Sequence, residues 1–383
     1  MNGKIIFSII MGLNLGIIFM NIPPAIDELM IFYHVSYTRI SLLISALLWS
    51  HALMQVPAGM ITDRWGIRRT LIMSLICMIF GHILAIAFTS LELAILGRVI
   101  AGIGTGLSVA STMKLVALYA PRGRIGTYQA FFGGFFSIGS IVAYLLIPFL
   151  VPVGWQWAYI LPLMTCLFLL AMLGLFKLEL DYTGTFTSLD LGRVFRVQEG
   201  WILGFYHALS FGSILTLGSW VPSLLAEVWG DVSSVKYAWG GALIMLVSGI
   251  GRLSGGFILF RFRPLLIVNA SIVILFAAFL GIFAITSPGF VLTLAILAAW
   301  FASVNFGALF HVASQITPPE SYATMFGFIN FLANMGAMIF TVMFGFIKDS
   351  AGTFSWGFAV LALLCFSTYL AGRMSFRTEK FEN

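Results

Sequence analysis

One arginine of this sequence lies deep inside an apolar stretch. Arg252 stands in the segment Gly251-Arg252-Leu-Ser-Gly255-Gly256, well within the apolar run at about 237–260. Ionisable residues in such runs are costly and usually functional. A guanidinium offers two parallel donors, which fit a carboxylate or a planar oxyanion. Arg252 therefore favours contact with an anion, and the competing interpretation is an arginine that ties its helix to loop backbone.

The acidic residues are distributed differently. The sequence holds 14 aspartates and glutamates, and all of them fall in predicted loops or at predicted helix ends. A cation-binding exporter or a carboxylate-based proton relay would need an acid inside the membrane. The apolar runs instead contain three basic residues, Arg98, Lys114 and Arg252, and no acid deep inside the runs balances their charge. A negatively charged substrate would compensate this positive charge, so the pattern favours an anionic substrate.

The composition is that of a membrane protein. Of the residues, 60% are hydrophobic and 9% are charged, whereas a soluble domain carries about 25% charged residues. Repeated apolar runs of bilayer length predict an all-α polytopic membrane protein, and the alternation typical of membrane barrels is absent. The net charge of +6 comes from basic residues in short loops, so we expect no nucleic-acid partner. The three cysteines lack metal-ligand spacing, and we expect no metal, no cofactor and no enzyme active site.

Twelve apolar runs predict twelve transmembrane helices. They span about residues 5–30, 38–62, 70–88, 92–118, 126–150, 155–176, 201–228, 237–260, 264–285, 290–314, 322–347 and 355–374. The first run contains Asn14, Asn21 and Pro23-Pro24, which predict a kinked or polar-lined helix. It lacks a small-residue cleavage site, so we interpret it as a helix and not as a signal peptide.

A polar connection at 177–200 divides the chain into six-helix bundles at 1–176 and 201–383. Most lysines and arginines fall in loops on the side of both termini, whereas the opposite loops hold Arg39, Lys236 and Lys348. By the positive-inside rule, both termini and the polar connection lie in the cytoplasm. We expect a monomer in the lipid bilayer of a bacterial cytoplasmic (inner) membrane.

The two bundles are pseudo-symmetric. With a constant shift of 197 residues, Gly59 coincides with Gly256, Arg64 with Arg261, Pro121 with Pro318, and Thr127 with Thr324. A constant shift indicates an internal repeat, and the even number of helices per copy makes the copies parallel. The same shift pairs Arg252 with Gln55, and Lys114 with His311. It places Phe260 opposite Asp63, so the second copy lacks this acid.

A charged motif lies between the second and third helices. It reads Gly59-Met-Ile-Thr-Asp63-Arg64-Trp-Gly66-Ile-Arg68-Arg69. This motif, the twelve helices and the two parallel halves resemble the major facilitator superfamily over nearly the whole chain. Two further segments are similar to the family's patterns. The fourth helix contains Arg98-Val-Ile-Ala-Gly102-Ile-Gly104-Thr-Gly106, and the sixth helix starts with Gly154-Trp155-Gln-Trp157. The fifth helix lacks the Gly-Pro pair of many proton-antiport drug exporters, which weakens an exporter interpretation.

The resemblance implies alternating access, in which two bundles expose a midplane site to one side at a time. Arg252 resembles the anion-binding arginine of monocarboxylate, oxalate and nitrate transporters. Gln55 departs from the nitrate-transporter pattern, which has arginine at both places. Arg98 would face the cavity and take part in proton movement or gating, or else anchor neighbouring helices by hydrogen bonds.

Several further polar residues are candidates for the transport path. Lys114 and His311 could form a cationic mouth at the cytoplasmic end of the cavity. The alternatives are a snorkelling lysine and a merely hydrogen-bonded histidine. Other side chains that could line the path, or simply bond helices together, are Tyr128, Asn305, Asn330 and Asn334. His207 and His51 are weaker candidates.

The gate is assigned to the charged motif, namely to Gly59, Asp63, Arg64, Gly66 and Arg68. Asp63 would latch to Arg64 and Arg68 on the cytoplasmic side when the transporter faces outward. The sequence thus predicts a secondary transporter that moves a small organic or inorganic anion by proton symport or by exchange for a counter-anion. The alternative is a proton-coupled exporter of amphipathic, drug-like compounds, which the 37 Phe and 17 Met residues favour weakly.

Overall fold

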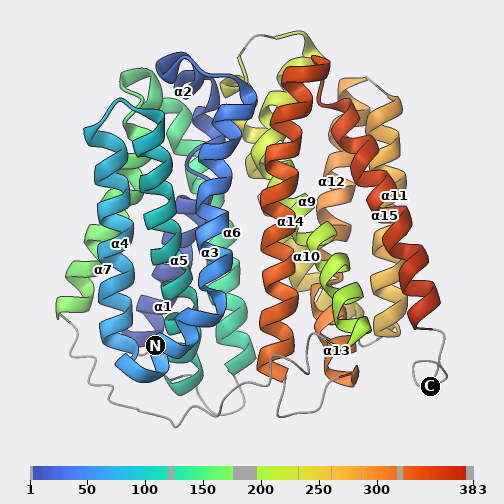
Figure 1. Ribbon diagram of the computed structural model, residues 1–383, viewed down its shortest axis with the longest axis horizontal. Helices are drawn as coiled ribbons and strands as arrows, with labels where there is room; N and C mark the ends of the chain where they lie inside the picture. Colours follow the sequence, from blue (N-terminus) through green and yellow to red (C-terminus); the bar gives the residue numbers. More distant parts are fainter. Residues whose placement is uncertain are drawn as a thin grey trace. The chain divides into compact units, whose positions relative to one another are not determined.

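The computed structural model describes residues 3–119, 125–175, 196–231, 233–259, 261–285, 287–316 and 322–376. Within these ranges every regular element is a helix (Figure 1). Ten of the described helical segments are long and apolar enough to cross a membrane. The helices α3 (Tyr37–Trp65) and α10 (Ala238–Ile258) are also long enough, but they carry more polar residues or glycines. The predicted all-α membrane fold is confirmed.

The chain divides into two compact units. Unit 1 spans Met1–Thr187 and Ser234–Ala242, and unit 2 spans Ser188–Ser233 and Leu243–Asn383. The polar connection predicted at 177–200 lies mostly outside the described residues, so the bundle boundaries stay a prediction.

Unit 1 contains the first six predicted helices. Its elements are α1 (Gly3–Phe19), η1 (Pro23–Ala25), α2 (Ile26–Tyr33), α3, α4 (Ile67–Ala87), α5 (Leu91–Tyr119), α6 (Ile125–Leu150), η2 (Val151–Val153), α7 (Trp157–Leu175), η3 (Val235–Tyr237) and the first residues of α10. In this unit α5 packs against α3 and α4, and α1 packs against α6.

Unit 2 contains the second set of helices. Its elements are α9 (Gln198–Trp229), the remainder of α10, α11 (Pro264–Ala284), α12 (Pro288–Val304), α13 (Phe306–Ile316), α14 (Tyr322–Ala351) and α15 (Ser355–Ser375). Here α14 packs along α9, and α11 packs against both α12 and α15. Each of the twelve predicted helices therefore has a counterpart in the structure.

The starts of the helices follow the internal repeat. The helices α4 and α11 begin at residues 67 and 264, α5 and α12 at 91 and 288, and α6 and α14 at 125 and 322. Each pair differs by 197 residues, the shift that the sequence landmarks indicate. The two copies therefore place matched residues at matched depths along their helices.

The first predicted helix is broken, as its asparagines and prolines indicate. The helix α1 ends at Phe19, and the chain resumes as a 3₁₀ turn at Pro23. Proline lacks the N–H that a continuous helix needs. The buried Asn14 accepts a hydrogen bond of 2.6 Å from the Thr165 hydroxyl of α7, so α1 carries polar groups toward its neighbours.

The tenth predicted helix is also broken, which the sequence analysis did not anticipate. The run at 290–314 forms α12 and α13, with Asn305 between them. The Asn305 amide donates a hydrogen bond of 2.7 Å to the Ser210 hydroxyl of α9. A Cβ atom on Gly255 would overlap the Val304 carbonyl, so α10 packs directly against this break.

The turn between α3 and α4 is shorter than expected. The sequence predicts helices that end near residue 62 and begin near residue 70, whereas α3 ends at Trp65 and α4 begins at Ile67. Gly66 adopts φ +80°, a region that side chains disfavour and glycine enters freely. The chain therefore reverses within one residue, and Asp63 lies in the last turn of α3 instead of in a loop.

Glycines set the close packing of α1 against α6. A Cβ atom on Gly139 of α6 would overlap the Leu13 carbonyl of α1, and one on Gly16 would overlap the Phe136 carbonyl. Small residues at such contacts let membrane helices approach backbone to backbone. Gly134, on the same helix α6, has no atom within 4 Å of such a Cβ atom.

We expect Gly139→Ala to destabilise the protein by about 1–3 kcal/mol, because the added methyl group forces α1 and α6 apart. Gly134→Ala is the matched control, and it should unfold at the wild-type temperature or slightly above it. Thermal unfolding of the purified variants in detergent measures the difference. Equal unfolding temperatures for both variants would show that this contact does not limit packing.

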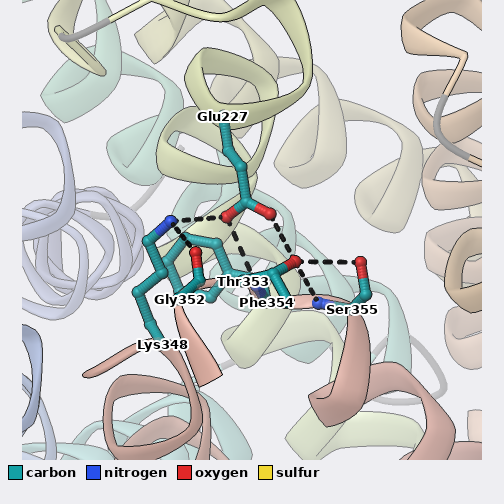
Figure 2. A network of polar contacts seen from close by, with 6 residues as sticks. All are labelled: Glu227, Lys348, Gly352, Thr353, Phe354 and Ser355. Atoms are coloured by element: carbon teal, nitrogen blue, oxygen red, sulfur yellow. Dashed lines mark hydrogen bonds and ion pairs between the residues drawn. The ribbon is translucent and has the colours of Figure 1, made fainter. Parts of the chain in front are cut away.

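A polar network joins the end of α9 to the connection between α14 and α15 (Figure 2). The Glu227 carboxylate accepts hydrogen bonds from Lys348 Nζ at 2.8 Å, from the Thr353 hydroxyl at 2.5 Å and from the Phe354 N–H at 3.3 Å. The side chains of Glu227 and Lys348 are only 21% and 18% exposed. This carboxylate therefore ties the start of α15 to α9.

We expect Lys348→Met to lower the free energy of unfolding by about 1–3 kcal/mol, because it leaves a shielded carboxylate without its cation. Adding Glu227→Gln to that variant should restore part of the loss, since no bare charge then remains. Thermal unfolding of the single and double variants tests this. Arg39→Met is the control: it breaks the exposed Arg39–Glu92 pair and should change little. A double variant no more stable than Lys348→Met would contradict the expectation.

Candidate functional site

Arg252 lies among aromatic rings in unit 2. It is carried by α10, and its guanidinium carbon lies 5.1 Å from the ring centre of Phe306 and 5.9 Å from that of Phe211. Such contacts stabilise a cation through the ring quadrupole. Because the N–H groups of a guanidinium lie in its plane, rings that contact its faces leave these donors available along its edge.

The donors of Arg252 lack acceptors. Its Nε atom is buried without a hydrogen-bond partner, and among the described residues no carbonyl or carboxylate accepts a bond from this side chain. The residue as a whole is half-buried, and a charge partly withdrawn from water is normally paired. The described contacts contain no hydrogen bond between Arg252 and loop backbone, which was the alternative role considered for this residue.

A histidine and two amides lie beside the cluster formed by Arg252, Phe211 and Phe306. His207 of α9 contacts the rings of Phe211, Phe306 and Phe310, with centroid distances of 5.8, 5.6 and 5.5 Å. Its Nε2 atom lies 3.2 Å from the Asn330 Oδ1 atom of α14. One turn further along α14, the Asn334 amide donates to the Asn330 carbonyl at 2.9 Å.

The break between α12 and α13 positions the aromatic side of the cluster. Phe306 is the first residue of α13, and Asn305 immediately precedes it. The Asn305 side chain is fully buried, and its Oδ1 atom has no described hydrogen-bond partner. Of the residues proposed from the sequence, Arg252, Asn305, Asn330 and Asn334 thus belong to one part of unit 2.

Sequence reasoning ranked His207 low and missed the three phenylalanines. A signal was present, because His207 and Phe211 are four residues apart, as are Phe306 and Phe310. Residues at this spacing share one helix face. In an apolar span, however, aromatic residues also face lipid, so the spacing alone does not mark a site.

Gln55 belongs to a polar chain in unit 1. Its amide nitrogen lies 2.7 Å from His51 Nε2, and His51 Nδ1 lies 3.0 Å from the Thr105 hydroxyl of α5. The ring of Phe19 packs edge-on against His51 at 5.1 Å. Gln55, the repeat counterpart of Arg252, therefore has a side-chain partner on its own helix.

Arg98 is buried in unit 1 and bonded to backbone. One of its terminal nitrogens donates to the Ile18 carbonyl at 2.9 Å and to the Asn21 side chain at 2.8 Å. Its Nε atom donates to the Leu43 carbonyl at 3.3 Å. Ile18 lies in the last turn of α1, where carbonyls lack helical partners. These contacts match the role of an interhelical anchor, one of the two roles considered for Arg98.

The remaining sequence candidates lie elsewhere. Lys114 is half-buried on α5, and His311 is exposed on α13. The side chains of Tyr128, Asp63 and Arg64 lie outside the described residues, so the latch of the charged motif stays a prediction. Arg68 is half-buried in the first turn of α4, and a Cβ atom on Gly59 would meet no atom within 4 Å.

The amino-acid sequence matches that of a known protein family. A sequence model of the Major Facilitator Superfamily matches residues 5–341. A nitrite extrusion protein of Bacillus subtilis (strain 168) is 21% identical over 366 residues, which cover 91% of this chain and 88% of that protein. A hexuronate transporter of the same organism is 24% identical over 371 residues, which cover 88% of this chain and 85% of that protein.

Solved transporters share the fold. The structure of a nucleoside transporter aligns with a TM-score of 0.80 at 13% identity, covering 98% of this chain and 100% of that one. A D-xylose–proton symporter aligns with a TM-score of 0.76 at 14% identity, covering 100% and 99%. Since the family match spans most of the chain and the twelve helices agree with it, this chain belongs to the Major Facilitator Superfamily, a family of membrane transporters.

Proposed function

We propose that this transporter carries a small organic or inorganic anion, which binds the guanidinium of Arg252. The observation that carries the proposal is a charged side chain among aromatic rings that has no hydrogen-bond acceptor among the described residues. An anion would supply both the missing acceptors and the missing negative charge.

The surrounding groups favour a planar anion. Phe306 and Phe211 contact the guanidinium and leave its edge for binding. A carboxylate or a planar oxyanion docks along that edge through two parallel hydrogen bonds. The amides of Asn330 and Asn334 add neutral donors nearby, which suit a singly charged anion with further hydrogen-bonding groups.

The positions of the acids support the same substrate class. Of the described acids, Asp27, Glu28, Glu92 and Glu199 lie in the first turns of their helices. Glu227 is occupied by Lys348 near the end of α9. No described carboxylate is thus available in mid-helix to hold a cationic substrate. The nitrite and hexuronate of the two relatives' names are both anions, which is consistent with this proposal.

The mechanism that we propose is alternating access, with the anion driven by proton symport or by exchange for a second anion. The protein would act as a monomer in a bacterial cytoplasmic membrane, with both termini in the cytoplasm and the halves joined at 177–200.

The phenylalanines around Arg252 favour a second candidate function, the export of amphipathic compounds. A thermal-shift screen separates the two: anions should stabilise the protein, whereas stabilisation by hydrophobic cations alone would support export.

We expect Arg252→Lys to reduce anion uptake by about 10- to 100-fold, because a lost charge-assisted hydrogen bond is worth about 1.5–3 kcal/mol and lysine lacks the planar fork. The measurement is uptake of labelled nitrite, oxalate, benzoate and galacturonate into liposomes that contain the purified protein. Arg263→Lys, an exposed residue just before α11, is the matched control and should transport normally. Undiminished uptake by Arg252→Lys would reject the assignment.

We expect Asp63→Asn to impair transport while membrane insertion and folding remain normal, because the proposed latch loses its charge. Its effect should be a shifted conformational balance, measured as changed labelling of single cysteines on the two membrane sides. Glu92→Gln removes an exposed acid elsewhere in unit 1 and serves as the control. Transport by Asp63→Asn at the wild-type rate would count against the latch.

A further inference from the structure

His207 has one ring nitrogen in use and one without a partner. Because the Asn330 Oδ1 atom can only accept, His207 Nε2 carries the ring hydrogen in their 3.2 Å contact. The other nitrogen, Nδ1, is then left with a lone pair. That nitrogen is buried and has no hydrogen-bond partner among the described residues, and the residue as a whole is 2% exposed. It is a vacant proton acceptor within the membrane span.

The charge that acts on His207 is that of Arg252. Both side chains contact the same two rings, those of Phe211 and Phe306. The phenylalanines screen charge poorly, so a second positive charge beside an unpaired Arg252 is unfavourable. Burial opposes a charge on His207 as well, but an anion on Arg252 removes the repulsion and so makes protonation of His207 more favourable than it is without the anion.

The other ionisable groups around α9 are directed elsewhere. Tyr206, the neighbour of His207, donates to Asn269 of α11 at 2.7 Å. On α14, Lys348 pairs with Glu227. The helices α11 and α12 carry no ionisable residues. His311, on α13, is exposed. Tyr369 and Arg373 lie on α15, and this helix contacts Tyr206 through Gly372.

We propose that His207 binds the co-transported proton. When an anion occupies Arg252, Nδ1 of His207 takes one proton from water. The proton returns to water from the same atom when the anion leaves, so the only bonds that form and break are the N–H bond at Nδ1 and an O–H bond of water. By linkage, a proton on His207 must strengthen anion binding by the factor by which the anion strengthens proton binding. The proposal rests on the proposed anion site, and it makes the transporter an anion–proton symporter.

The other histidines fit this role less well. Both ring nitrogens of His51 lie within hydrogen-bond distance of partners, Thr105 and Gln55. His82 is buried like His207, with Nδ1 2.6 Å from the Met78 carbonyl and Nε2 unpaired. The nearby arginine of unit 1, Arg98, is held by backbone carbonyls and Asn21. Three described acceptors hold Arg98, although one of its terminal nitrogens has no partner, whereas no described residue accepts a bond from Arg252. His82 therefore lies outside the proposed anion site and provides a control.

The test compares two modes of transport by the full-length protein in liposomes. The probe is the anion of the four above with the largest Arg252-dependent uptake. In His207→Gln the amide still donates to Asn330 but cannot take up a proton. We expect accumulation driven by a pH gradient to fall at least about tenfold, while anion–anion counterflow, measured at saturating anion so that weaker binding does not limit it, stays within about twofold of wild type. His82→Gln should retain both modes.

A second measurement does not depend on a variant. Adding the same anion to purified wild-type protein in weakly buffered detergent solution should remove about one proton from the medium per anion bound, as the linkage requires. Counterflow without pH-driven accumulation in the wild type, or unchanged accumulation in His207→Gln, would overturn the role of His207 and leave the anion site standing. A wild type without Arg252-dependent anion transport would overturn both proposals.

Discussion

The cost of an unsatisfied polar group in hydrocarbon governs this structure. Arg98 meets most of that cost within the protein, because carbonyls of α1 and α3 and the side chain of Asn21 accept hydrogen bonds from two of its three nitrogens, while the third has no described partner. Glu227 meets it with Lys348 and the start of α15. Arg252 does not meet it with any described residue. This contrast is the basis for proposing that the partner of Arg252 comes from outside the protein.

Each unit associates a buried arginine with a broken helix, but the roles differ. In unit 1 the break after α1 frees backbone carbonyls, and Arg98 satisfies one of them. In unit 2 the break at Asn305 is held by Ser210, and it delivers Phe306 to the guanidinium of Arg252. Irregular backbone is tolerated at membrane depth only where protein groups or a cavity satisfy it. The first break therefore stabilises the bundle, and the second shapes the proposed site.

The repeat explains why the site is one-sided. Shifting by 197 residues places Arg252 opposite Gln55, His207 opposite Ile10, and Asn330 opposite Gly133. The backbone frame is shared, as the matched helix starts indicate. The side chains that give charge and a proton acceptor are present only in the second copy. A two-fold scaffold thus carries one asymmetric set of functional groups.

The sequence by itself determined the membrane fold, the twelve helices and the repeat, because apolar run length and spacing act locally along the chain. It could not determine that α3 runs on to Trp65 or that α12 ends at Val304, since those limits depend on the backbone angle of Gly66 and on the contact of Asn305 with another helix. Only the tertiary structure decided that backbone carbonyls accept hydrogen bonds from Arg98 while no described residue accepts one from Arg252, and that His207 shares two aromatic neighbours with Arg252. Hydrogen-bond partners of a buried charge come from distant segments, so their presence or absence is a property of the fold.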